Sequence, residues 1–196
     1  MLKKMSKPFA IALIILGALL LAILTDMGIF LIEKEQHPII YKEYVEKYAS
    51  EYNIPEYMIF AVIKVESGFD PNATSSAGAM GLMQMMPDTF RWLTSSEHLC
   101  EYLSASSLYD PEVSIRYGCY YLRYLFEKFH NWDTVFAAYN GGEGNVAKWL
   151  QNGEYSDGNG NLTNIPFRET KNYVRKVNNA LEFYKDTYYK NEVSVK

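Results

Sequence analysis

A single carboxylate stands at the end of an apolar segment in the first half of the chain. The stretch IKVESGF (63–69) places Glu66 directly before Ser67 and Gly68. A glutamate that such a segment carries into a protein interior is poorly hydrated, and the loss of hydration raises its pKa. A glutamic acid that stays neutral near pH 7 can donate a proton as a general acid. The alternative is a glutamate that simply reaches solvent at a helix end.

The elements around this carboxylate are predicted to be helical. Tyrosines recur at helical spacing over 41–52, and a second, more apolar helix is predicted from Pro55 to Glu66. Further helices are expected over 87–92, 111–129, 132–139, 146–150 and 169–189, with loops at 67–81, 94–110 and 151–167. No segment outside these loops shows the alternation of a strand. The expected fold class is therefore all-α, with helices packed irregularly.

The N-terminus has a different composition. An uncharged run at 9–24 continues, after the polar pair Thr25 and Asp26, to Ile32. Residues 9–32 are long enough to span a membrane, and the three lysines among the first seven residues place the N-terminus in the cytoplasm. A signal peptide is the alternative. We expect an uncleaved anchor, because no small-x-small cleavage site follows the uncharged run.

Composition limits the other functional classes. The apolar fraction is 48% and the charged fraction 21%, which is typical of a globular domain. The net charge of −4, without a basic stripe beyond the first seven residues, argues against nucleic acid as a partner. Cys100 and Cys119 are either two separate thiols or a disulfide. The DGNGNLT stretch (157–163) begins like a calcium loop but lacks its glycine and bidentate glutamate, so we expect no metal and no cofactor.

The segment that follows Glu66 carries a long, specific pattern. ESGFDPNATSSAGAMGLMQMMPDTF (66–90) resembles the signature of the family 1, or soluble-type, lytic transglycosylases, which are similar to glycoside hydrolase family 23. Three further blocks follow in the family's order, at 110–125, 138–146 and 165–177. The block at 110–125 has Ser114 where the family usually has asparagine, a departure that concerns a contact at a helix start.

This resemblance covers about residues 40–185 and implies a lysozyme-like fold, closest to goose-type lysozyme. It implies cleavage of the β-1,4 bond between N-acetylmuramic acid and N-acetylglucosamine in peptidoglycan, without water, to leave 1,6-anhydro-muramoyl ends. Glu66 is the implied catalytic residue. The implied substrate-binding residues are Ser75, Met83, Gln84, Met86, Tyr139, Asn140 and Tyr173.

These residues have different expected roles. Ser75 is expected to bind Glu66 or the N-acetyl group, unless it only closes a turn, and Gln84 offers a sugar both a donor and an acceptor. Met83 is expected in the groove wall and Met86 in the core. Tyr173 is placed on the inner face of the last helix, where its hydroxyl can reach the catalytic glutamate or simply belong to the core.

Two residues come from the AYNGG segment of the block at 138–146. Tyr139 and Asn140 precede two glycines, so the backbone there can approach a ligand closely.

Most glycosidases use two carboxylates. The other acidic residues in these blocks, Asp70, Asp88 and Glu143, occupy positions that the family leaves variable. A single-carboxylate mechanism is therefore the simpler interpretation, with Glu66 acting first as acid and then as base, and the substrate's N-acetyl group stabilising the developing cation.

The expected organisation is an anchor or signal sequence at 1–32, a polar linker at 33–40, a catalytic domain at 41–190 and a tail at 191–196. We expect a monomer, held in the cell membrane by one span, whose extracytoplasmic domain acts on peptidoglycan glycan strands. The alternatives are a muramidase that hydrolyses the same bond and a non-catalytic wall-binding component of a secretion apparatus.

Overall fold

The structure, a computed structural model, describes residues 6–95 and 97–190. The predicted tail at 191–196 and two of the three N-terminal lysines, Lys3 and Lys4, lie outside these residues. The chain divides after Pro38 into two compact units.

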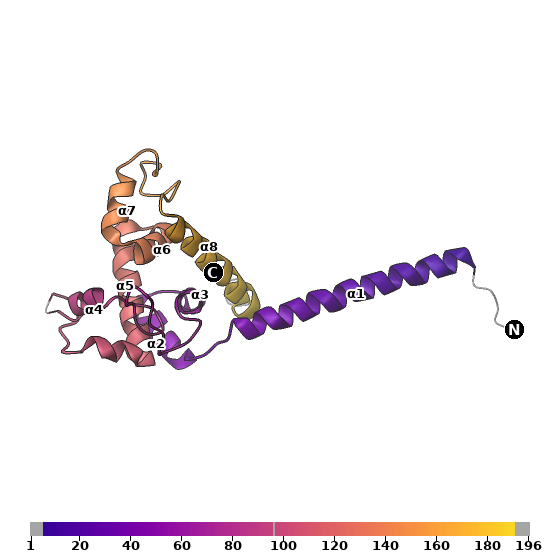
Figure 1. The fold of residues 1–196 in the computed structure, drawn as a ribbon, viewed down its shortest axis with the longest axis horizontal. Helices are drawn as coiled ribbons and strands as arrows, with labels where there is room; N and C mark the ends of the chain where they lie inside the picture. The colour runs from indigo at the N-terminus through magenta and orange to yellow at the C-terminus, as the bar shows by residue number, and fades with distance from the viewer. Residues whose placement is uncertain (1–5, 96, 191–196) are drawn as a thin grey trace. The chain divides into compact units, whose positions relative to one another are not determined.

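The first unit contains one helix, α1 (Lys7–Gln36), drawn in indigo and violet in Figure 1. It is long and apolar enough to cross a membrane, and none of its residues is buried within the protein. The helix continues through 33–36, the first four residues of the predicted polar linker. The glutamates, lysine and glutamine of this segment are good helix formers, and the helix ends just before Pro38.

The second unit is built from helices, and the part of it that the structure describes has isolated β-bridges but no strand. This confirms the all-α prediction. Its helices are α2 (Lys42–Tyr52), α3 (Glu56–Glu66), α4 (Pro87–Leu93), the 3₁₀ helix η1 (Ala105–Tyr109), α5 (Pro111–Phe129), α6 (Trp132–Gly141), α7 (Glu143–Leu150) and α8 (Arg168–Tyr188).

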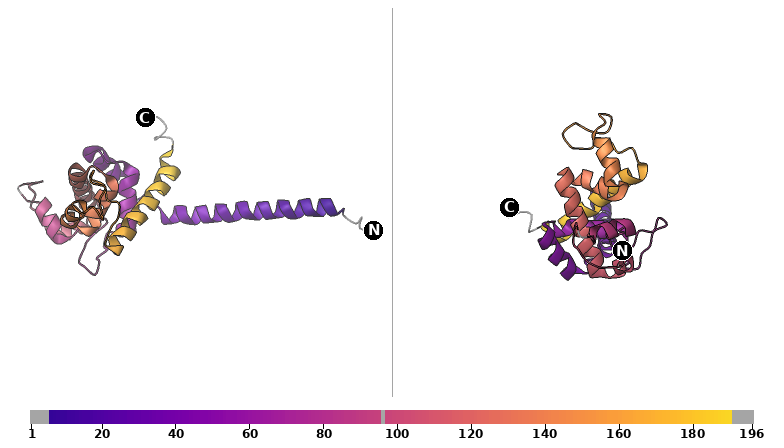
Figure 2. Two further views of the ribbon diagram at one scale, coloured as in Figure 1. Left: turned by 90° about the horizontal axis from the view of Figure 1, so that it is seen from above. Right: turned by 90° about the vertical axis from the view of Figure 1, so that its left-hand side faces the viewer.

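The core of the unit is centred on α3. All six residues from Met58 to Ile63 are buried, and α3 packs along α8, which lies at one side of the unit in the left-hand view of Figure 2. The helix ends at Glu66 because Gly68 and Phe69 both adopt positive φ, at +61° and +72°. The apolar helix therefore stops with a carboxylate at its inner end.

The helix α5 matches its predicted bounds of 111–129 because several signals agree there. Pro111 is its first residue, and the Asp110 side chain caps it by accepting a hydrogen bond from the Val113 N–H at 3.1 Å. The helix packs against α2 and α6. Two boundaries needed correction. Residues 105–109 form η1 rather than loop, and the interval between the helices predicted at 132–139 and 146–150 shrinks to Gly142.

The two cysteines are free thiols rather than a disulfide. Cys100 is exposed and Cys119 is buried in α5. Burial raises the pKa of the Cys119 thiol well above its usual range.

Candidate active site

Glu66 lies at the C-terminal end of α3 and is partly exposed to solvent. The protein atoms that surround its carboxyl group desolvate the charged form and raise its pKa to about 7, while a weaker hydrogen-bonding interaction with Tyr173 acts in the opposite direction. The direction of the pKa shift is the one that the apolar segment before Glu66 predicts. A carboxyl with this pKa is present in both protonation states at neutral pH.

Two tyrosines approach Glu66 from different helices. Tyr173 of α8 is buried, and its hydroxyl interacts with Glu66 without reaching the geometry of a regular hydrogen bond. Tyr139 of α6 is close enough for the Glu66 charge to raise its pKa, although desolvation is the larger cause. The structure thus brings together three residues that the sequence places on three separate helices.

The loop after Glu66 is fixed to the core through its backbone. The Ser67 hydroxyl donates to the Leu82 carbonyl at 2.8 Å, and the Ser114 hydroxyl of α5 accepts from the Met83 N–H at 3.1 Å. The Tyr139 hydroxyl donates to the Met83 carbonyl at 2.8 Å. Ser114, the departure from the family pattern, therefore still makes a contact between α5 and this loop.

The environments expected for Met83 and Met86 are reversed in the structure. Met83 is completely buried and packs so closely on Gly118 that a Cβ there would lie 2.2 Å from its sulfur. Met86 is 41% exposed. The predicted groove wall at Met83 and core position at Met86 are both wrong. The cause is the irregular backbone of 80–86, where no regular period decides which side chain faces inward.

The polar residues of the same loop mainly hold the loop together. Gln84 has a positive φ of +46°, and its amide Nε2 donates to the carbonyls of Ala73 and Gly81 at 3.1 and 2.9 Å. The exposed Ser75 hydroxyl accepts from the Ala79 N–H at 3.0 Å. This is the turn contact that was the alternative to a direct role for Ser75.

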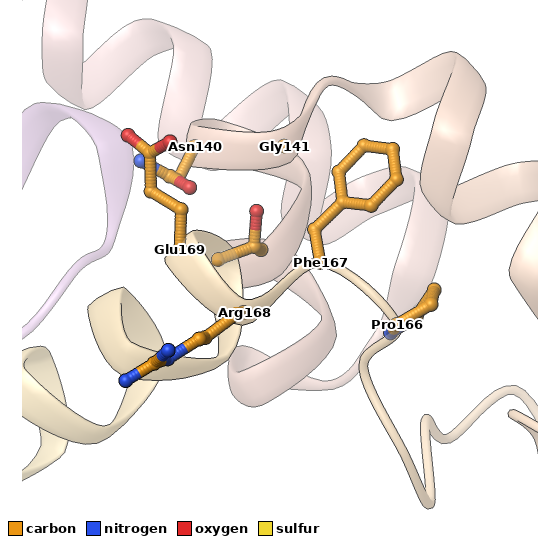
Figure 3. A pocket seen from close by; sticks show the side chains of 7 residues that line it. Asn140, Gly141, Pro166, Phe167, Arg168 and Glu169 are labelled. Carbon is orange, nitrogen blue, oxygen red and sulfur yellow. The ribbon is translucent and has the colours of Figure 1, made fainter.

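A pocket of about 510 Å³ opens beside Asn140, between the end of α6 and the start of α8 (Figure 3). The Glu169 and Asn140 side chains lie on the same side of the pocket, whereas Arg168 points away. Gly141 is needed here because a Cβ would lie 2.9 Å from the Thr170 hydroxyl oxygen. The lining also includes Pro166 and Phe167.

Sequence reasoning missed these α8 residues as candidates for the site. They belong to the quoted block 165–177, and the signal that could have found them is the acidic Glu169 four residues before Tyr173, which is one helical turn away.

The other acidic residues of the family blocks are engaged elsewhere or exposed. Asp88 pairs with Arg91 on the surface, and Glu143 pairs with Lys128 at 3.1 Å. Asp70 is exposed and caps its own turn through the Asn72 N–H at 2.9 Å. In the calcium-like loop, the Asp157 carboxylate accepts hydrogen bonds from Asn159 and Asn161 of that loop.

Comparisons with known proteins agree with this geometry. The Transglycosylase SLT domain family matches residues 43–160, which is more than half of the chain. Soluble lytic murein transglycosylase of Escherichia coli K12 is 36% identical over 160 residues, which cover 80% of this chain and 24% of that protein. Membrane-bound lytic murein transglycosylase C of Cronobacter sakazakii is 32% identical over 170 residues, covering 72% of this chain and 45% of its own length.

Solved structures give the same result. The crystal structure of the 70 kDa soluble lytic transglycosylase from Escherichia coli superposes with a TM-score of 0.69 at 35% identity, over 76% of this chain and 25% of that one. The complex of the 70 kDa soluble lytic transglycosylase with bulgecin A gives 0.67 at 32% identity, with the same coverage.

The helices and the site define a lysozyme-like domain of the lytic transglycosylase type, which confirms the predicted fold. The chain belongs to the Transglycosylase SLT domain family. It spans about a quarter of the length of the soluble relatives and just under half of the membrane-bound relative.

Proposed function

We propose that the chain is a peptidoglycan lytic transglycosylase that cleaves the bond between N-acetylmuramic acid and N-acetylglucosamine and leaves 1,6-anhydro-muramoyl ends. The observation that carries this proposal is Glu66, a carboxyl of pKa about 7 at the inner end of an apolar helix. A group half protonated at neutral pH suits a reaction in which one residue serves as acid and then as base.

The proposed reaction begins with protonated Glu66, which donates its proton to the glycosidic oxygen as the bond to C1 breaks. The substrate's N-acetyl group stabilises the positive charge that develops at C1. Glu66, now a carboxylate, removes the proton from the C6 hydroxyl, whose oxygen attacks C1. Protons and bonds balance, because the proton lost to the leaving group is regained from the hydroxyl.

The neighbouring residues support this sequence of steps. In our proposal Tyr173 orients Glu66 and stabilises its carboxylate form, while Tyr139 holds the loop through the Met83 carbonyl. Gln84, the exposed Met86 and Asn140 contact the glycan, with Ser75 donating its free hydroxyl hydrogen to substrate or to Glu66. Glu169 joins them on the α8 side of the pocket.

The competing function is a muramidase of the same fold, which adds water to the same bond. The two are separated by digesting purified peptidoglycan with the full chain and weighing the muropeptides. Anhydro ends are lighter than hydrolysed ends by one water. Products with reducing ends alone would overturn the transglycosylase and favour the muramidase, and no cleavage at all would favour the non-catalytic wall-binding component.

We also propose that α1 is an uncleaved anchor, with the N-terminus in the cytoplasm and a monomeric catalytic domain outside the membrane. The length and apolar surface of α1 support this arrangement. Cys100 offers a test, because it is exposed whereas Cys119 is buried. A membrane-impermeant thiol reagent should label intact cells at Cys100, and labelling only after lysis would contradict this topology.

A further inference from the structure

A second pocket, of about 340 Å³, lies between the C-terminal end of α2 and the C-terminal half of α5; we call it the α2–α5 pocket. It shares no lining residue with the pocket beside Asn140. No step of the proposed reaction uses it, and its lining combines aromatic and charged side chains.

Three tyrosine rings form the aromatic part of the α2–α5 pocket. Tyr52 and Tyr120 have ring centroids 5.8 Å apart, and all three rings, including Tyr124, are partly exposed. Tyr124 is packed edge-on against Trp92 at 5.0 Å, and the Tyr120 hydroxyl is hydrogen-bonded to the His98 ring at 3.0 Å. The rings are therefore held in place before any ligand arrives, which lowers the entropic cost of binding.

Polar groups complete the lining. Arg123 Nε donates to Glu127 Oε1 at 2.9 Å, and only 33% of the Arg123 side chain is exposed. Glu51 and Asn53 lie at the end of α2. The charged residues of this lining carry a net charge of −1, which disfavours phosphate and carboxylate ligands.

We propose that the α2–α5 pocket is a second binding site for neutral saccharide, in which sugar C–H faces pack on the tyrosine rings and hydroxyl groups bond to Arg123, Glu51 and Asn53. Tyrosine rings supply rigid contact area with a polar edge, and a few convergent polar groups can fix the orientation of a bound ligand. The inference rests on the proposed function, since a long glycan strand supplies neutral N-acetylglucosamine units far from the bond that is cleaved.

Contacts between aromatic rings connect the α2–α5 pocket with the candidate active site. The Tyr121 ring is stacked 6.2 Å from Tyr124 of the α2–α5 pocket and 5.4 Å from Tyr139, which is close to Glu66. Two such sites on one domain can hold the same polymer. The second contact then becomes intramolecular and raises the affinity for long strands without changing that for short ones.

The test uses the full chain in detergent with the substitution Glu66→Gln, so that no probe is consumed. Chitotetraose, isolated long glycan strands and the free stem tetrapeptide are titrated separately. The pocket variants are Arg123→Ala and Glu51→Ala, and Arg91→Ala is the matched control, since Arg91 is a surface arginine outside both pockets. Glu51 is exposed on α2, so its replacement by alanine is compatible with folding.

We expect two classes of chitotetraose site in the parent and in Arg91→Ala, and one class in each pocket variant. Affinity for long strands should fall roughly tenfold or more in the pocket variants, as expected when one of two linked contacts is lost. Unchanged binding in both pocket variants would overturn the proposal. A loss confined to the stem tetrapeptide would overturn the assignment to saccharide.

A parallel digestion separates this proposal from the proposed function. With Glu66 intact, Arg123→Ala should still produce anhydro ends from short glycan strands at the parental rate. Absence of anhydro ends from the parent itself would reject the proposed reaction, whereas the titrations above judge the α2–α5 pocket independently of any cleavage.

Discussion

The Tyr139 hydroxyl donates a hydrogen bond of 2.8 Å to the main-chain carbonyl of Met83 and so ties α6 to the loop that follows Glu66. Tyr139→Phe removes this donor and leaves the carbonyl without it. We expect a loss of about 1–3 kcal/mol in the free energy of unfolding and slower turnover. Denaturant unfolding and digestion rates check both, with the fully exposed Tyr102→Phe as control. A variant as stable and as active as that control would contradict the role of this contact.

The raised pKa of Glu66 has a consequence for stability. Because the folded-state pKa of about 7 exceeds the value of an exposed glutamate, the neutral form stabilises the folded chain fully below the unfolded pKa. This contribution is lost as pH rises through 7. Glu66→Gln, which stays neutral, should therefore gain melting temperature relative to the parent as pH rises from about 4 to 8. The same variant should bind glycan and lose cleavage. A constant difference in melting temperature across this range would contradict the raised pKa.

Tyr173 lowers the pKa of Glu66 against the larger effect of burial. Tyr173→Phe should therefore raise the pKa of Glu66 above 7 and move the alkaline limb of the pH–rate profile to higher pH. Its rate should also fall, since the carboxylate form is less stabilised. The profile is measured beside that of Tyr102→Phe, and a limb that stays in place or moves to lower pH would show that Tyr173 does not act on this carboxyl.

Gly118 of α5 lies directly against Met83, since a Cβ there would meet the sulfur at 2.2 Å. Gly118→Ala should cost about 1–3 kcal/mol by overpacking. Gly144→Ala is the matched control, because that glycine is also helical and has no atom within 4 Å of an added Cβ. It should be neutral or stabilising by about 1 kcal/mol. Equal unfolding midpoints for the two variants would argue against close packing at Gly118.

The helices could be predicted where several local signals agree. Residues 111–129 have a capping aspartate, a proline at the first position and a regular apolar face, and the structure has the same bounds. The 3₁₀ helix at 105–109 has no such period, and 33–36 carry no break before Pro38. Local sequence signals therefore predict the bounds of regular helices correctly, but they do not predict short helices or helix ends that lack a capping or breaking residue.

The site was predictable only in part for a related reason. Glu66 follows from the apolar run before it, and the family pattern points to the residues around it. The burial of Met83 and the exposure of Met86 depend on contacts with α5 and on positive φ angles in the loop, neither of which the local sequence encodes. The pocket beside Asn140 needs α6 and α8 side by side, which is a property of the tertiary fold.

Gln84 shows what such a loop does to recognition. A carboxamide has two N–H donors and an acceptor oxygen, but the Nε2 of Gln84 already donates to the carbonyls of Ala73 and Gly81. Only its oxygen is left for a ligand. The sequence predicts that Gln84 can both donate and accept hydrogen bonds, but in this loop it can only accept them. Its oxygen can bind a sugar hydroxyl or an amide N–H, and it repels a ligand group that has lone pairs and no hydrogen to donate.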